Sequence, residues 1–228
     1  MTAQVLHSSV VRTLGQEITA GALPVGTVLT LESIQQRFEV SRTVAREAMR
    51  MLESVGLVTS RRRVGLVVRP VTDWDVFDPR VIRWRLDGPG RLAQLRSLTE
   101  LRIAVEPMAA GAAARSADRD TQERLVTLAA RLRELGEAGR LEEFLACDVE
   151  FHALLLRASH NEMFAALQDV VAEVLAGRTH HGLMPHNPRP EALDAHDAVA
   201  RAVLARDEAG AEQAMARIVD EVRHALPE

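Results

Sequence analysis

Residues 40–50, which read VSRTVAREAMR, restrict the possible fold of this chain more than any other stretch. Ser41 is a favourable N-cap residue, so a helix is predicted to begin directly after it. Apolar residues recur behind it at helical spacing and predict one buried face: Val44, Ala48, Met51 and Leu52. Arginines recur four residues apart and predict the opposite, solvated face: Arg42, Arg46 and Arg50. Such a helix fits a DNA major groove flanked by phosphates, and a surface helix with arginines for solubility fits the pattern equally well.

The residues on either side of this helix favour DNA binding. Residues 31–38 predict a short helix that only three residues separate from the next one, which is the spacing of a helix-turn-helix. Downstream, Gly56 stands where a helix commonly ends, and residues 57–60 and 64–68 predict two strands. The tip between these strands is the run RRR at residues 61–63, so the hairpin is predicted to reach the DNA backbone or the minor groove.

The segments SRTVAREAMRMLESVGLV and RRRVGLVV resemble the DNA-binding domain of GntR-family bacterial regulators, over about residues 8–70. The resemblance implies base and phosphate contacts from Arg42, Thr43 and Arg46, and wing contacts near Gly65. The N-cap, the arginine face and the wing tip complete the predicted DNA-binding set: Ser41, Arg42, Thr43, Arg46, Arg50, Arg62, Arg63 and Gly65. The dipeptides at 32–33 and 65–66 depart from the family pattern, so the preferred operator is not carried over from relatives.

Charge is distributed unevenly along the 228 residues. The net charge is −4, yet residues 1–72 hold 9 Arg and 5 acidic residues, so the acidic excess lies entirely in the rest of the chain. This distribution is expected when only a small first domain binds DNA. We therefore predict a winged-helix domain at 1–70, a linker with a short helix at 71–90, and an effector-binding bundle at 91–228.

The cysteine content and the hydropathy pattern predict a reducing, aqueous environment. Cys147 is the only cysteine, so a disulfide framework within the chain is not possible. The sequence contains no N-terminal signal pattern and no apolar run of membrane-spanning length. We expect a cytoplasmic protein that does not associate with membranes.

Helical periodicity continues through the rest of the chain. The predicted helices cover residues 91–117, 121–138, 141–158, 162–177, 190–206 and 208–226, with a loop at 177–190. Their lengths and short connections predict an all-α antiparallel bundle. The fold class is therefore mainly α: an N-terminal winged helix-turn-helix with a small β-hairpin wing, followed by a C-terminal helical bundle.

Four polar side chains fall on helix faces that are otherwise apolar, where burial without partners is costly. They are Arg102, Asp148, His152 and His196, from three predicted helices. One carboxylate and two imidazoles suit a divalent metal, with Zn²⁺ first and Ni²⁺, Mn²⁺ or Fe²⁺ as alternatives, and a nearby guanidinium would pair with an organic acid. The other interpretation is structural: an Asp–His hydrogen bond within one helix, a satisfied core His196, and Arg102 paired with Glu106.

The segments LTELRIAVEPMAAGAAA, DVEFHALLLRASHNEMF and AHDAVARAVLARDEAGAEQAM resemble the FCD ligand-binding domain of FadR-type GntR regulators, over about residues 92–225. The resemblance implies metal binding by Asp148, His152 and His196, and effector binding by Arg102. Ile218 stands where many members have a fourth ligand, a histidine. The metal would then be held by three residues with water or effector, be bound more weakly, or be replaced by an ordered water. Three loop histidines are conceivable substitutes, although surface histidines are the better interpretation: His180, His181 and His186.

Together these features predict a ligand-responsive transcriptional regulator, not an enzyme. We expect a homodimer that reads palindromic half-sites on double-stranded DNA and represses a catabolic operon. The expected effector is a small organic or sugar acid that chelates the metal and pairs with Arg102. Two alternatives stay open, a metalloenzyme that uses the Asp–His–His set and a metal-free regulator with an acyl-type effector. The sequence offers the enzyme no general acid or base near that set.

Overall fold

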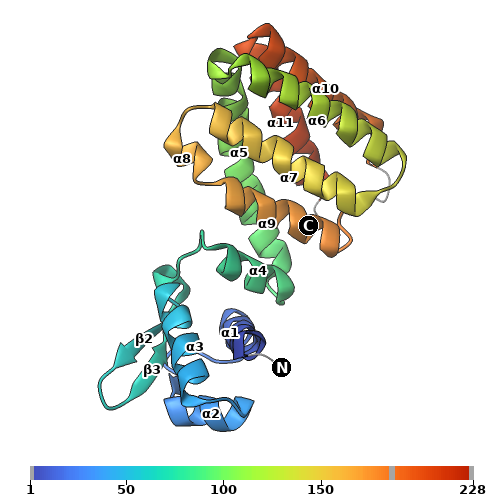
Figure 1. The fold of residues 1–228 in the computed structure, drawn as a ribbon. Coiled ribbons are helices and arrows are strands. Elements are labelled where there is room, and N and C mark those ends of the chain that lie inside the picture. The colour runs from blue at the N-terminus through green and yellow to red at the C-terminus, as the bar shows by residue number, and fades with distance from the viewer. Residues whose placement is uncertain (1–2, 185–187, 226–228) are drawn as a thin grey trace. The chain divides into compact units, whose positions relative to one another are not determined.

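The chain divides into two compact units, Met1–Arg91 and Leu92–Glu228, in a computed structural model (Figure 1). The structure describes residues 3–184 and 188–225. We refer to these parts as the N-terminal unit and the C-terminal unit, and describe each by itself.

The N-terminal unit is a winged helix-turn-helix, as the sequence predicts. Its elements in chain order are α1 (Ala3–Thr19), β1 (Val28–Leu29), α2 (Leu31–Phe38), α3 (Arg42–Ser54), β2 (Val58–Arg61), β3 (Gly65–Val68), the 3-10 turn η1 (Val71–Asp73) and α4 (Pro79–Asp87). The predicted two-stranded wing is part of a three-stranded antiparallel sheet of order β1-β3-β2. The third strand, β1, spans two residues, which is too short to leave a period-two pattern in the sequence.

Side-chain caps define where the two helices of the helix-turn-helix begin. The Thr30 hydroxyl accepts from the Ser33 amide at 3.0 Å, and the Ser33 hydroxyl accepts from the Thr30 amide at the same distance, which forms a reciprocal capping box. Ser41 caps α3 by accepting from the Val44 amide at 3.3 Å. Replacing such a cap with alanine costs about 1 kcal/mol. These caps fix the turn between α2 and α3, so they position the arginine face of α3.

Two glycines are required by the backbone around the wing. Gly56 follows α3 with a φ of +76°, and a Cβ there would lie 2.3 Å from the Asp73 carbonyl oxygen. Gly65 begins β3 with a φ of +125°, and a Cβ there would lie 2.6 Å from the Leu29 carbonyl oxygen. A side chain at either position would meet both conformational strain and a backbone clash. Gly65 therefore has a structural role in joining β3 to β1.

Residues 71–91 group with the N-terminal unit. Asp78 caps α4 by accepting from the Arg80 amide at 2.8 Å, and Pro79 occupies the first helical turn. Val81 and Trp84 from α4 are buried in the same core as α1 and α3, and Trp84 lies so close to Gly15 that a Cβ there would clash. The segment predicted as a linker with a short helix is thus packed onto the winged helix.

The C-terminal unit is all-helical, as the sequence predicts. Its helices are α5 (Arg91–Ser116), α6 (Arg119–Glu137), α7 (Leu141–Ala158), α8 (Glu162–Ala165), α9 (Gln168–His180), α10 (Pro190–Ala205) and α11 (Glu208–Ala225). Helix α6 lies between α7 and α10, α11 packs on α10, and α9 packs on α7 (Figure 1). Apolar residues from α5, α6, α7, α10 and α11 form one continuous core. Among the described residues, no helix is both long and apolar enough to cross a membrane.

One predicted helix is in fact two. The predicted helix at 162–177 is interrupted at residues 166–167, between α8 and α9. Asn161 caps the start of α8 by accepting from the Met163 amide at 2.9 Å. Helix α9 then continues to His180, into the predicted loop. The extension matters for the site, because it places Arg178 within α9.

Candidate functional site

The predicted DNA-binding face of α3 is exposed in the N-terminal unit. Exposed side chains on this helix include Arg42, Thr43, Arg46 and Arg50, and the opposite face is buried in the core. Arg50 donates from Nη1 to Glu47 Oε1 at 2.7 Å, so a neighbouring carboxylate already partly neutralises it. Arg42 and Arg46 therefore offer the stronger positive charge at the N-terminal part of the helix, which is the part that reads base edges in a helix-turn-helix.

The wing tip carries three exposed arginines at residues 61–63. The amide of Val64 donates to the Arg61 carbonyl at 3.0 Å and closes the turn, and Arg63 has a left-handed φ of 63°. The close approach of β1 limits what Gly65 itself can contribute to DNA binding, because its conformation serves the sheet. Positive charge at the tip suits contacts to phosphates, which depend on charge and not on sequence.

A cavity of about 330 Å³ lies within the C-terminal unit. Its lining combines all four residues singled out from the sequence with apolar side chains and three further charged residues: Arg102, Asp148, His152, Arg178, Arg189, His196 and Glu221, with Phe144, Leu175, Leu183, Met184, Pro188, Ala192, Ile218 and Val222. Few convergent polar groups on a largely apolar wall are typical of small-ligand sites. The structure therefore brings together Arg102 from α5, Asp148 and His152 from α7, and His196 from α10.

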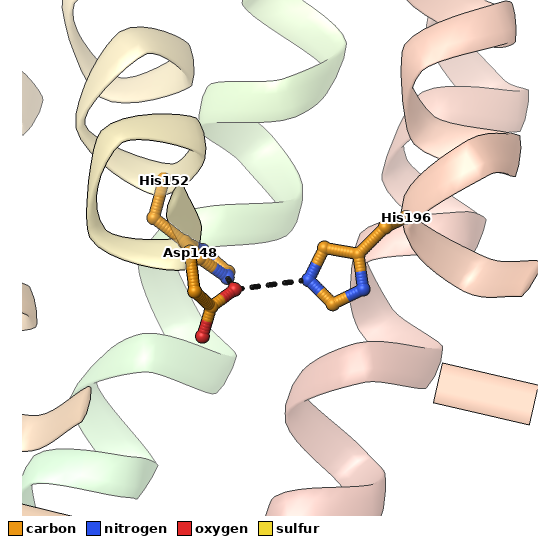
Figure 2. Close-up of side chains that lie close together, drawn as sticks. All are labelled: Asp148, His152 and His196. Carbon is orange, nitrogen blue, oxygen red and sulfur yellow. Dashed lines mark hydrogen bonds and ion pairs between the residues drawn. The ribbon is translucent and has the colours of Figure 1, made fainter. Parts of the chain in front are cut away.

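Asp148 lies at the centre of the three predicted metal ligands (Figure 2). Its Oδ1 is 3.2 Å from His196 Nε2 and 3.4 Å from His152 Nε2. All three side chains are buried, and their ligand atoms lie within 4.8 Å of one another. Burial alone would raise the pKa of Asp148, but the two imidazoles beside it hold that pKa well below its usual range.

The hydrogen bond at the far side of His196 prepares its Nε2 for a cation. Nδ1 lies 2.7 Å from the Ala192 carbonyl oxygen, which can only accept, so Nδ1 carries the hydrogen. In the neutral ring, Nε2 would then present a lone pair to the Asp148 carboxylate. Two facing acceptors need a cation between them, either a proton or a metal ion.

Glu106 lies beside Nδ1 of His152, as the Ala192 carbonyl lies beside Nδ1 of His196. Its Oε2 lies 2.6 Å from His152 Nδ1, at ion-pair distance, although neither ring nitrogen of His152 has a partner with hydrogen-bond geometry among the described residues. Burial disfavours the charged imidazole, but Glu106 and Asp148 outweigh it and raise the pKa of His152 to about 9. In the absence of a metal, His152 is thus protonated at neutral pH and neutralises Asp148.

The donor set fits a divalent metal ion. Neighbouring ligand atoms of a tetrahedral zinc site are about 3.4 Å apart, given bonds of about 2.0–2.2 Å, and the Asp148 contacts of 3.2 and 3.4 Å match that separation. The carboxylate that holds His152 and the carbonyl that holds His196 are the outer partners that metal-binding histidines normally have. Ile218 lines the same cavity, so a hydrocarbon side chain occupies the wall that a fourth protein ligand would need.

Arg102 is paired with Glu106 and keeps one nitrogen without a partner among the described residues. Its Nε lies 2.5 Å from Glu106 Oε1 and its Nη2 lies 3.2 Å from Glu106 Oε2, which is the pairing of the structural interpretation. Its Nη1 is buried and has no hydrogen-bond partner among the described residues. Burial opposes the charge on Arg102, but the Glu106 carboxylate outweighs it and raises the pKa of Arg102. Burial likewise opposes the charge on Glu106, but Arg102 and His152 outweigh it and lower the pKa of Glu106 to about 2. Arg102 is therefore charged and fixed in place beside the cavity, with one donor nitrogen that has no partner among the described residues.

The other candidate residues lie away from this cavity. His180 is exposed and 3.7 Å from Glu142, His181 does not line the cavity, and His186 falls outside the described residues. His224 is exposed, and its Nδ1 is 2.7 Å from the Asp220 carbonyl. Cys147 is buried in the helical core, with its thiol 3.5 Å from the Leu128 carbonyl, and burial raises its pKa to about 11. This thiol is therefore neither a ligand nor a reactive nucleophile.

Sequence reasoning missed the contact between Glu106 and His152, and it missed three charged residues that line the cavity: Arg178, Arg189 and Glu221. Glu106 was assigned only to Arg102, because the four-residue spacing of this pair gives no sign that Glu106 also contacts His152. Arg178 lies in the last part of α9, one residue beyond the predicted end of that helix at 177, so it was placed in the predicted loop. Glu221 lies on α11 one turn after Ile218, and that spacing is the signal that places it on the cavity side.

Comparison with known proteins decides the family. The sequence profile of the FCD domain matches residues 97–221, more than half of the chain, and that of the bacterial regulatory proteins of the gntR family matches residues 6–68. The chain belongs to the GntR family of bacterial regulators and carries an FCD domain. It is a DNA-binding transcriptional regulator.

Relatives that match most of the chain include transcriptional regulators of named operons. The galactonate operon transcriptional repressor of Escherichia coli (strain K12) is 28% identical over 90% of this chain and 90% of its own length. The Uxu operon transcriptional regulator of the same organism is 30% identical over 86% of this chain and 76% of its own. Because the family and these relatives are transcriptional regulators, the metalloenzyme interpretation is set aside.

Solved structures of similar fold include E. coli McbR/YncC, with a TM-score of 0.55 and 20% identity over 97% of this chain and 96% of that one. Streptococcus agalactiae GntR has a TM-score of 0.52 and 22% identity over 96% of this chain and 99% of that one. At these identities the likeness concerns the fold alone.

Proposed function

We propose that the regulator is a homodimeric repressor of a catabolic operon and that a small organic or sugar acid releases it from its operator. The acid binds in the cavity of the C-terminal unit beside a divalent metal, Zn²⁺ in the first place. The observation that carries this proposal is the convergence of Asp148, His152, His196 and the unpartnered Nη1 of Arg102 on one cavity of about 330 Å³.

Each residue has a distinct part in this proposal. Asp148, His152 and His196 would hold the metal, which when bound supplies a positive charge and open positions for oxygen ligands. Nη1 of Arg102 donates to the carboxylate of the acid, while Glu106 keeps the guanidinium in position. An acyl-type effector would leave these buried charges without partners, so the polar wall favours a hydroxy acid.

The direct test is release of DNA from the operon's own promoter. Fluorescence anisotropy of a labelled promoter fragment is measured with zinc-loaded protein, with and without galactonate, gluconate and related hydroxy acids. We expect tight binding that at least one acid relieves. A protein that never binds its promoter, or that no acid displaces from it, contradicts the proposal.

We expect Arg46→Ala and Arg62→Ala to weaken DNA binding in different ways. Loss of a base contact by Arg46 should cost about 1–3 kcal/mol on the operator and little on unrelated DNA. Loss of a phosphate contact by Arg62 should weaken binding to all sequences and reduce the slope of log K against log salt by about 1. Titrations of operator and scrambled duplex at several salt concentrations separate the two. Equal losses on both duplexes in Arg46→Ala would remove it from the base-reading set.

We expect Arg102→Lys to retain DNA and metal binding and to lose release by the effector. Lysine keeps a positive charge beside Glu106, so the buried carboxylate stays compensated, but it cannot pair in two directions as a guanidinium does. Alanine would instead leave Glu106 buried alone. The anisotropy assay above, with metal content measured on the same sample, checks this. A variant that responds to the acid like wild type would show that Arg102 serves only Glu106.

A further inference from the structure

Arg178 is a second buried guanidinium at the cavity. It lies in the last part of α9, lines the cavity together with Arg102, and is only 9% exposed. Like charge on Arg102 and burial both disfavour its charge, and burial is the larger effect. Its pKa is lowered to about 10, so the side chain remains charged at neutral pH.

Among the described residues Arg178 has no carboxylate at ion-pair distance, although Asp148 and Glu221 attract its charge from farther away. Within the described part of the chain, its one side-chain hydrogen bond is from Nη2 to the Met184 thioether at 3.9 Å, and a thioether is a weak acceptor. Glu221 lines the same cavity, but among the described residues no carboxylate lies within 4.0 Å of Arg178. A buried charge without a partner is costly, and folded proteins normally supply one. Arg102 has Glu106 as its partner, whereas the open side of Arg178 is the cavity itself.

We infer that the effector carries two anionic groups, one for Arg102 and the metal site and a second, a carboxylate or a phosphate, for Arg178. This inference rests on the proposed function and narrows its effector class from hydroxy acids in general to hydroxy acids with a second acidic group. The two guanidiniums come from different helices, α5 and α9, so a ligand with two acidic ends bridges them. Glu221 accepts hydrogen bonds from hydroxyl groups between those ends.

The volume of the cavity agrees with a small acid that carries two anionic groups. A cavity of about 330 Å³ lies at the small end of the range for ligand pockets, which favours a compact acid over a long chain. A bidentate guanidinium–carboxylate or guanidinium–phosphate pair in a buried site is among the stronger polar contacts. The second acidic group therefore contributes both affinity and selectivity.

The test compares acids that differ only at one end. Gluconate, glucarate and 6-phosphogluconate share the same hydroxyl stereochemistry and carry a hydroxymethyl, a carboxylate and a phosphate ester at C6, and galactonate and galactarate form a second pair. Calorimetric titration of the zinc-loaded, full-length protein gives the affinity of each. We expect at least one two-charge acid to bind about 10- to 100-fold more tightly than its one-charge counterpart. The arms with glucarate and with 6-phosphogluconate distinguish a carboxylate from a phosphate.

Arg178→Gln should remove that selectivity and little else. The preferred two-charge acid should lose about 10- to 100-fold in affinity, while the one-charge acid changes by less than about threefold. Arg201→Gln is the control, because Arg201 is an exposed arginine of α10 whose side chain, among the described residues, bonds only to the Asp197 carbonyl, at 3.3 Å. Equal losses of affinity for both acids would mean that Arg178 and Arg102 bind one carboxylate together, which overturns the inference.

The unliganded protein provides an independent readout. Removing an unpaired buried charge should stabilise the free protein, so Arg178→Gln should melt at a higher temperature than wild type when no acid is present. A lower melting temperature would show that Arg178 supports the fold, and would contradict its role as an anion site. If neither one-charge nor two-charge acids bind to wild type, the proposed function fails, and the inference falls with it.

Discussion

Removal of divalent metal is expected to lower the melting temperature of the regulator by about 5–10 °C. A ligand present at about 100 times its dissociation constant stabilises the folded state by about 2.7 kcal/mol, and each kcal/mol shifts the melting temperature of a protein of this size by about 2–4 °C. The stabilisation arises because Asp148 and His152 on α7 and His196 on α10 would share one ion. Differential scanning calorimetry with and without a chelator measures the shift.

His196→Ala should melt at nearly the same temperature with and without chelator. His224→Ala is a closely matched control, because His224 makes the same contact to a carbonyl four residues earlier, also at 2.7 Å, but is exposed on α11. It should keep the full chelator sensitivity of wild type. Metal content is measured on protein purified without chelators or metal-affinity resin. If wild type then contains no stoichiometric metal and its melting temperature does not change with chelator, the site with Ile218 in place of a fourth ligand does not bind metal. The cavity is then a polar pocket without metal.

The elements with strong local signals could be predicted from the sequence. The N-cap at Ser41, the alternating faces of α3 and the glycine at 56 each follow from local chemistry, and the structure contains the helix that they predict. Long amphipathic helices such as α6 and α7 differ from their predicted ranges by at most two residues at either end. Such signals depend on neighbours within one turn, so tertiary structure does not override them.

Elements that depend on distant partners could not be predicted. Strand β1 exists because Val28 and Leu29 pair with Val67 and Leu66, some forty residues later. The break between α8 and α9 lies at residues 166–167, where the sequence continues an apolar period that also suits one longer helix. Arg178 was missed because the predicted helix at 162–177 ended one residue before it, whereas α9 continues to His180.

In the candidate site, too, contacts within one helix could be predicted from the sequence, and contacts between distant helices could not. Asp148 and His152 are four residues apart on one helix face, so their proximity was predictable. The approach of His196 was inferred from its apolar helix face and from the family resemblance. Which carboxylate holds which cation was not predictable, because that depends on how α5 meets α7. The structure assigns Glu106 to both Arg102 and His152, and this double role leads to the largest effect that we expect of a single substitution.

Glu106→Gln is expected to lower the free energy of unfolding by about 3–5 kcal/mol, because removing one member of a buried ion pair leaves the other charge uncompensated. Glu106 and Arg102 are both almost fully buried, and the same carboxylate also faces His152. Glu123→Gln is the matched control: Arg119 and Glu123 form the same four-residue pair at 2.6 Å, but both are exposed. An exposed pair contributes about 0–1 kcal/mol, so the control should differ little from wild type.

Urea unfolding at several pH values tests both the size and the origin of this effect. Circular dichroism follows the helices of both units, whereas the two tryptophans, Trp74 and Trp84, belong to the N-terminal unit and report on it separately. The pKa of Glu106 is lowered from 4.5 to about 2, so its contribution is complete above pH 4.5 and is lost as the pH falls toward 2. The difference between wild type and Glu106→Gln should therefore shrink over that interval. A difference that stays constant down to pH 2 would mean that packing, and not the charge of Glu106, stabilises the cavity wall.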